Sequence, residues 1–184
     1  SSIKLVAVSK TRSPEEIRKA YNAGHRIFWE NRVQELLSNK DSLPEDIAWH
    51  LIGHLQTNKV KYIVPFISMI HSVDSFRLLK TIDYEAKKIY RTVDCLLQFH
   101  IASEETKFGF TLEEAAGMIE SDDFRQLDSV RICGVMGMAT LTRDMDQVRK
   151  EFSNLAGCFN VLKEKFFSGI LSFSEKSMGM SGDF

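Results

Sequence analysis

Short apolar runs alternate with longer amphipathic runs along the whole chain, and this alternation constrains the fold more than any other feature. The apolar runs are rich in β-branched residues and have the length of buried strands. Strands are predicted at residues 3–9, 26–31, 47–53, 69–73, 92–101 and 130–138, and a seventh at either 170–174 or 176–178. Strands with no polar face are typical of a parallel sheet that helices cover.

The segments between these strands have the signals of helices. In the first of them, Ser13 stands at the N-cap, Pro14 at the first helical position and Glu16 at the capping-box position. The longest helix is predicted at residues 144–166. Its apolar stripe comprises Val148, Phe152, Leu155, Phe159, Leu162 and Phe166. The helix that begins at Ser13 is predicted to end at Gly24, and further helices are predicted within residues 32–39, 57–63, 75–90 and 111–119.

The predicted strands and helices make up about six and a half βα units. Two architectures are built from such units, an open doubly wound sheet and a (β/α) barrel. An eight-unit barrel usually needs ~250 residues, or ~200 at the small end, and this chain has 184. The chain also begins and ends abruptly, in strand-like and glycine-rich sequence respectively. We therefore predict an α/β fold of the (β/α)8 TIM-barrel type, incomplete at both termini and lacking the eighth strand, with residues 1–184 as a single domain.

Composition excludes several classes of function. The 24 Lys and Arg residues balance 25 Asp and Glu residues, so no broad positive field is available for nucleic acid or an acidic membrane. No apolar run approaches the ~20 residues that span a bilayer, and the start does not resemble a signal peptide. The three cysteines cannot form a disulfide framework and include no C-x-x-C pair. We therefore expect a cytoplasmic protein with reduced thiols.

Functional residues are sought at the carboxyl ends of the strands, where parallel α/β folds bind their ligands. Lys10 closes the first predicted strand, on the same face as Val6 and Val8. Desolvation there and the neighbouring Arg12 are expected to lower the pKa of the amine, and a neutral amine can form a Schiff base with an aldehyde. The alternative interpretation is a surface lysine at the start of a loop.

A second candidate site is the glycine-rich segment 177–182, Ser-Met-Gly-Met-Ser-Gly. Backbone N–H groups at a helix N-terminus bind anions, and Ser181 adds a hydroxyl. An ordinary N-cap turn is the other interpretation. His50 and His54 are four residues apart and could share a metal on a helix, but residues 48–52 are a predicted strand that Gly53 ends, and no Glu or Cys ligand follows, so we expect no metal site. No nucleotide-binding glycine motif is present.

Seven sequence blocks follow one another in an order typical of one family. They are residues 6–11 (VAVSKT), 28–35 (FWENRVQE), 49–59 (WHLIGHLQTNK), 71–75 (HSVDS), 105–109 (ETKFG), 134–138 (GVMGM) and 177–184 (SMGMSGDF). In these blocks the chain resembles the pyridoxal phosphate homeostasis protein family, which is related to the N-terminal domain of bacterial alanine racemase. The resemblance covers essentially the whole chain.

The resemblance implies a barrel that holds pyridoxal 5′-phosphate (PLP) as a Schiff base on Lys10 and serves intracellular vitamin B6 homeostasis. The cofactor-binding residues that it implies are Lys10, Asn31, His50, Ser72, Met138, Met180, Ser181 and Gly182. The last three would hold the phosphate, and the strand-end residues would surround the ring. Arg12 and Lys107 would add positive field for a phosphate or a carboxylate.

The chain departs from the family pattern in two places. Trp29 stands where the family usually has glycine, and the family's leading helix and its final helix and strand, with Gly-Ser-Thr and Arg, are absent. The expected partners are PLP itself, apo forms of PLP-dependent enzymes and amino acids, with neither nucleic acid nor membrane. We expect a monomer.

Three alternatives remain open. A small fold-type III PLP enzyme, such as an amino-acid racemase, needs an acid/base opposite Lys10, and no Tyr or Cys is obviously placed for it. A Schiff-base aldolase would use Lys10 without a cofactor, and a purely structural barrel would leave Lys10 on the rim. We expect a non-catalytic carrier with no catalytic residues, because the chain has no room for the second domain that supplies the racemase base.

Overall fold

The computed structural model describes residues 3–102 and 108–180. Within these ranges seven parallel strands form one sheet, in which each strand pairs with its neighbours in the sequence. The strands are β1 (Ala7–Val8), β2 (Ile27–Glu30), β3 (Ala48–Leu51), β4 (Met69–Val73), β5 (Val93–Phe99), β6 (Val130–Ala139) and β7 (Glu175–Met180). This order is that of a (β/α) barrel rather than of a doubly wound sheet, so the predicted architecture of a barrel without its eighth strand is confirmed.

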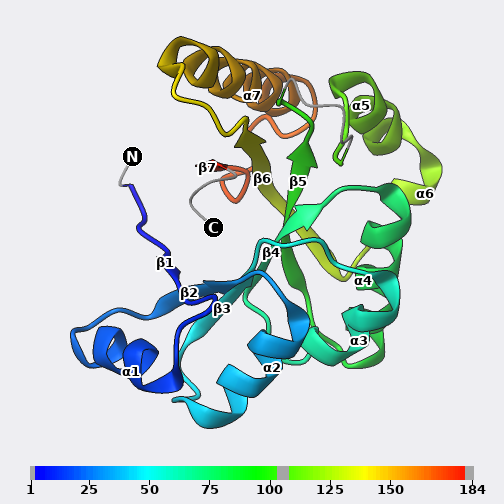
Figure 1. Ribbon diagram of the computed structural model, residues 1–184. Helices are drawn as coiled ribbons and strands as arrows, with labels where there is room; N and C mark the ends of the chain where they lie inside the picture. The colour runs from blue at the N-terminus through cyan, green and yellow to red at the C-terminus, as the bar shows by residue number, and fades with distance from the viewer. Residues whose placement is uncertain (1–2, 103–107, 181–184) are drawn as a thin grey trace.

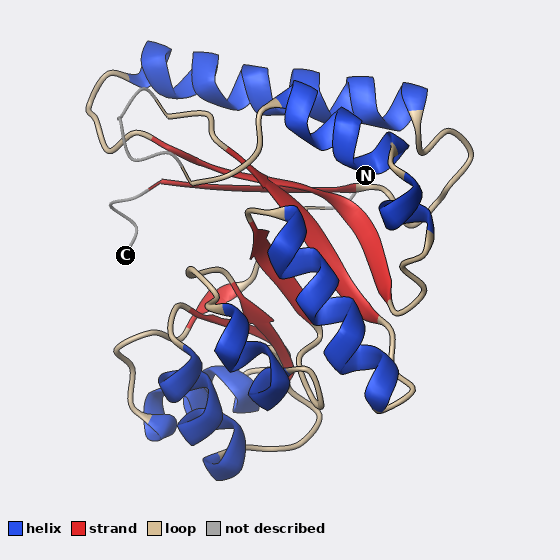
Figure 2. Cartoon of the chain, turned by 90° about the vertical axis from the view of Figure 1, so that its right-hand side faces the viewer, coloured by secondary structure: helices blue, strands red, loops and turns tan. Residues whose placement is uncertain are grey.

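Helices connect the strands on the outer side of the curled sheet, and β1 and β7 form its two edges (Figure 1). They are α1 (Pro14–Asn22), α2 (Val33–Ser42), α3 (Val60–Ile63), α4 (Phe76–Lys88), α5 (Leu112–Glu120), α6 (Asp122–Arg125) and α7 (Met145–Lys165), with a 3-10 turn at Thr57–Lys59. Figure 2 shows the molecule from the side on which helices cover the strands. None of the helices in the described ranges is long and apolar enough to cross a bilayer.

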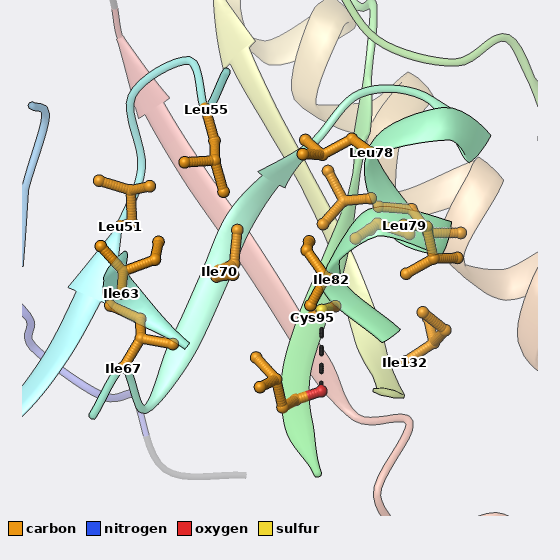
Figure 3. Packing of buried hydrophobic residues seen from close by; sticks show 14 of the residues in the cluster. Leu51, Leu55, Ile63, Ile67, Ile70, Leu78, Leu79, Ile82, Cys95 and Ile132 are labelled. Atoms are coloured by element: carbon orange, nitrogen blue, oxygen red, sulfur yellow. Dashed lines mark hydrogen bonds between the residues drawn. The ribbon is translucent and has the colours of Figure 1, made fainter. Parts of the chain in front are cut away.

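The main hydrophobic core lies between the sheet and these helices. Side chains alternate along each strand, so Leu51 and Ile70 point toward the helices and meet Ile63, Leu79 and Ile82 there (Figure 3). All five side chains are fully buried. Burial of each one stabilises the fold by about 1.5–3 kcal/mol. The core therefore fixes which face of each strand is left for the concave side of the sheet.

The first strand is shorter than predicted. The sequence pattern suggested a buried strand at residues 3–9, but only Ala7 and Val8 pair with β2, and Ile3 and Leu5 are 98% and 78% exposed. Among the described residues β1 has no strand on its other side, so the residues before Ala7 have no second surface to pack against. The alternation of faces still holds at the end of the strand, where Val8 lines the concave side and Ser9 is buried on the other.

The seventh strand forms from the second of the two competing segments, at Glu175–Met180. The other segment, residues 170–174, is a turn because its aromatic residue packs beneath α7. The ring of Phe173 stacks on those of Phe167 and Phe159, at centroid distances of 4.2 and 5.0 Å. Stacking of this kind stabilises more than burial alone, and it outweighs the strand pattern of the segment.

The buried face of α7 includes a charged residue that the apolar pattern did not predict. Phe152 and Phe166 are only half-buried, whereas Glu151 is 5% exposed. The Glu151 carboxylate accepts hydrogen bonds from the backbone N–H and the hydroxyl of Thr140, both at 2.7 Å. Glu151 therefore attaches the helix to the loop that follows β6, a role that apolar periodicity does not reveal. The short helix α6 was not predicted.

Candidate functional site

The concave face of the sheet lines a cavity of about 510 Å³. Most of its walls are apolar. They include Val8, Ile27, Trp29, Ile52, Met69, Leu96, Met136 and Met138. Three uncharged polar side chains also line it, His50 from β3, His71 from β4 and Ser177 from β7, together with the charged residues Lys4, Glu175 and Lys176. A mostly apolar cavity with a few convergent polar groups is the usual form of a small-molecule site.

The three polar side chains form one hydrogen-bonded chain across the cavity wall. His50 Nδ1 lies 2.9 Å from His71 Nε2, and His71 Nδ1 lies 2.9 Å from Ser177 Oγ. A neutral imidazole has one donor and one acceptor nitrogen, so the chain can run in either direction with both rings uncharged. It joins β7 to the middle of the sheet.

Burial keeps both rings neutral. Desolvation lowers the pKa of His50 to about 4, with a further effect of the Lys4 charge. Desolvation lowers the pKa of His71 to about 3, and the neighbouring His50 adds to the effect. At neutral pH the pair therefore offers hydrogen bonds but no positive charge to a ligand.

Lys10 lies in a tight turn directly after β1. The Arg12 N–H donates to the Ser9 carbonyl at 3.1 Å, which closes the turn, and Thr11 has a φ of 58°. The half-buried Lys10 places Nζ 5.8 Å from the ring centroid of Trp29, and the Trp29 side chain lines the cavity. The amine thus lies near an aromatic side chain of the cavity wall, although Lys10 itself is not a lining residue.

Asn31, Gly53 and Ser72 meet at the carboxyl ends of β2, β3 and β4. A Cβ atom at Gly53 would collide with the carbonyl oxygen and the side chain of Asn31. The Ser72 hydroxyl donates to the Gly53 carbonyl at 2.7 Å. Gly53 is therefore required by the close approach of two neighbouring strand ends, and the Ser72 hydroxyl is used to hold this rim together.

A buried acid supports the turn from the other side of the sheet. Glu30, at the end of β2, is fully buried, and its Oε1 lies 2.7 Å from both Ser9 Oγ and Asn39 Nδ2. Both of these hydrogen-bond partners are neutral groups.

The eight expected cofactor residues fall into three groups. His50 and Met138 line the cavity, while Lys10, Asn31 and Ser72 lie at its rim or at the adjoining strand ends. Met180 ends β7. Ser181 and Gly182 lie outside the described residues, as does Lys107. The first five are thus brought to one end of the sheet.

Sequence reasoning missed the role of His71, and it placed Ser177 in the glycine-rich candidate site without predicting its contact with His71. A usable signal was present in β4, because His71 stands two residues after Met69, and both side chains line the cavity. The contact between His71 and Ser177 joins two residues that are 106 positions apart in the sequence. Such long-range contacts depend on the curl of the sheet, which a strand pattern does not contain.

Fold and site together define a (β/α) barrel-type binding protein with a lysine at the carboxyl end of the first strand. The sequence profile of the family described as "Alanine racemase, N-terminal domain" matches residues 2–184. A pyridoxal phosphate homeostasis protein from Synechocystis is 37% identical over 188 residues, which cover 100% of this chain and 83% of that protein. The chain belongs to the pyridoxal phosphate homeostasis protein family.

Two solved structures of the PipY protein from Synechococcus elongatus resemble the chain. The structure without PLP has a TM-score of 0.88 and 34% identity, and the match covers 98% of this chain and 83% of that one. The structure with PLP bound has a TM-score of 0.79 and 27% identity, and the match covers 97% of this chain and 90% of that one. The fold is therefore similar to one that is known with the cofactor bound.

Proposed function

We propose that this protein binds pyridoxal 5′-phosphate as a Schiff base on Lys10 and acts in intracellular vitamin B6 homeostasis. The observation that carries the proposal is the position of the Lys10 side chain, half-buried, with its amine 5.8 Å from the ring centroid of Trp29, which lines the cavity. Relatives that carry the homeostasis name and the PLP-bound structure of PipY support the choice of cofactor.

The residues present suit this cofactor. The mostly apolar walls of the cavity are suitable for a flat aromatic ring, and the neutral His50–His71 pair can offer it a hydrogen bond without a competing charge. The Lys10 amine, in its neutral form, adds to the aldehyde carbon; one water molecule leaves, and a C=N bond replaces the C=O bond. When bound, the cofactor supplies an electron-withdrawing ring.

Each residue near Lys10 has a distinct part in this proposal. Trp29 shields the amine and limits the room at the rim, in place of the glycine that is usual in the family. Asn31 and Ser72 shape the adjoining strand ends, and backbone N–H groups at residues 180–182 would hold the phosphate. Strand pairing places the Met180 backbone beside Ala139, next to Met138.

We further propose that the protein carries the cofactor without catalysing a reaction on amino acids. A racemase needs an acid/base group on each face of the cofactor ring, and the two histidines that line the cavity are bonded to each other with lowered pKa values. Amino acids or apo-enzymes would then accept the cofactor by displacing Lys10. A cytoplasmic location is in keeping with the free thiols of Cys95, Cys133 and Cys158.

The test is a titration with PLP followed by absorbance. The native protein is expected to develop the absorbance band of a lysine Schiff base, and Lys10→Ala is expected not to develop it. Lys4→Ala is the matched control, because Lys4 also lines the cavity but pairs with Glu175 at 2.6 Å. A native spectrum that stays unchanged would reject the proposal. Incubation with L-alanine should leave its chirality unchanged; racemisation would favour the enzyme instead.

A further inference from the structure

Glu30 is a buried acid whose place in the fold is not explained by the cavity. Trp29 before it faces the cavity, whereas Glu30 faces α2 and receives a hydrogen bond from Asn39 on that helix at 2.7 Å. Its Oε2 has no hydrogen-bond partner within the described ranges. Burying a carboxyl group with incomplete hydrogen bonding costs free energy, and an apolar residue of similar volume is often as stable or more stable there.

The other contact of Glu30 leads to Lys10. Ser9 Oγ lies 2.7 Å from Glu30 Oε1 and 2.8 Å from the Trp29 carbonyl oxygen, and Ser9 is only 2% exposed. The Ser9 backbone is also held, because its N–H donates to the Trp29 carbonyl and its own carbonyl accepts from Arg12, both at 3.1 Å. Ser9 is thus the fixed end of the turn that carries Lys10.

The turn needs such a fixed end because it is strained. Thr11 has a φ of 58°, in the left-handed region that a β-branched residue rarely adopts. Strain of this kind persists only where the surrounding structure holds it. Without the contacts of Ser9, the turn is free to relax, and the direction of the Lys10 side chain changes with it.

We propose that Glu30 is a positioning residue for Lys10, which acts through Ser9 to hold the turn that directs the Lys10 amine toward the cavity. This inference rests on the proposed function, in which the Lys10 amine reacts. Glu30 itself is not among the residues that line the cavity. Its effect is to keep the reactive amine in one orientation, which speeds reactions of correctly placed groups.

The number of hydrogen atoms available at the Ser9 hydroxyl indicates which protonation state of Glu30 suits the two short contacts. The Ser9 hydroxyl has one hydrogen but two acceptors within reach, so a protonated Glu30 carboxyl would complete the second hydrogen bond. Burial raises the pKa of Glu30, and the nearby Glu35 carboxylate adds to the effect. In Glu30→Gln the amide N–H₂ group can donate to Ser9 Oγ and, with the Asn39 amide reversed, to the Asn39 oxygen, so this variant is expected to replace Glu30.

The test compares Ser9→Ala, Glu30→Leu and Glu30→Gln in the full chain. One measurement is the rate at which PLP forms a borohydride-trapped adduct on Lys10, and the other is hydrogen exchange of the Arg12 amide without PLP. Ser9→Ala and Glu30→Leu are expected to slow the adduct roughly tenfold and to speed the exchange, whereas Glu30→Gln restores both. Ser9→Ala keeps the test valid if Glu30→Leu does not fold.

The matched control is Asp83→Leu. Asp83 is a second buried acid, 7% exposed, and it accepts hydrogen bonds from the Asp128 and Ser129 amides at 3.0 and 2.7 Å. Its loss should lower stability but leave the rate at Lys10 unchanged. The inference would be overturned if Ser9→Ala and Glu30→Leu formed the Lys10 adduct at the native rate. It would also be overturned if Asp83→Leu slowed the adduct as much as they do. If native protein forms no adduct on Lys10, the proposed function fails, and Arg12 exchange still tests the hold on the turn.

Discussion

The glycine at position 53 shows how one missing side chain shapes the rim of the site. In Gly53→Ala the new Cβ would meet backbone and side-chain atoms of Asn31, and overpacking against backbone typically costs about 1–3 kcal/mol. We expect the free energy of unfolding to fall by that amount in urea titrations. Gly157→Ala is the control: nothing lies within 4 Å of a Cβ there, inside α7, so it should gain ~0.5–1 kcal/mol. Equal effects in the two variants would contradict the account.

At the scale of residues, the sequence was sufficient where chemistry follows from position on one strand. Lys10 was predicted from the alternation of a single strand and the rule for strand ends. Its amine lies 5.8 Å from the ring centroid of Trp29, which lines the cavity, and its role as the Schiff-base lysine stays a prediction. The hydrogen bond between Ser9 and Glu30 was not predicted, because it joins the ends of two strands on the face of the sheet that the helices cover. Contacts between elements depend on packing, which residue patterns specify only in part.

Two helices end in the same motif with different residues, which provides a test at the scale of elements. After α4, Arg91 N–H bonds to the Ala86 carbonyl and Tyr90 N–H to that of Lys87, with Tyr90 at φ 54°. This is a Schellman motif, in which glycine is preferred at the left-handed position. Tyr90 is 99% exposed, so Tyr90→Gly loses no packing and should raise the unfolding free energy by about 1 kcal/mol.

The matched change is at the end of α1. Gly24, at φ 102°, occupies the equivalent position, since its N–H bonds to the Tyr21 carbonyl and that of His25 to the Ala20 carbonyl. No atom lies within 4 Å of a Cβ placed there, so Gly24→Ala adds backbone strain alone. Its thermal midpoint should fall while that of Tyr90→Gly rises. A fall in both would show that the Tyr90 side chain contributes contacts that its exposure does not indicate.

Elements with local signals were predicted well, and the edges of the sheet were not. The capping box of Ser13 and Glu16 is present at the start of α1 as predicted. In contrast, β1 and β7 depend on how far each edge of the sheet finds partners and on aromatic stacking under α7. Neither property is local in the sequence, so both ends of the sheet differ in length or position from the pattern.

The buried histidines make the stability of the whole molecule depend on pH. The pKa values of His50 and His71 in the fold, about 4 and about 3, lie below the ordinary value of 6.5. Unfolding therefore takes up protons below about pH 6.5, so stability is complete above that pH and declines as the pH falls toward 4. His71→Leu should be less stable at pH 8 but show a weaker decline between pH 6.5 and 5 in urea titrations.

The control for this prediction is His54→Gln, because the His54 side chain is 55% exposed. It should keep the native dependence on pH. A decline as steep in His71→Leu as in the native protein would show that other groups are responsible. The dependence is a property of the assembled sheet, since the histidine chain joins β3, β4 and β7.

The most direct test of the central claim is to locate the covalent bond to the cofactor. The protein is incubated with PLP, reduced with borohydride, digested and examined by peptide mass spectrometry. The account predicts the added phosphopyridoxyl mass on the peptide that contains Lys10. The same mass found instead on Lys4 or Lys176, which line the cavity, would contradict it.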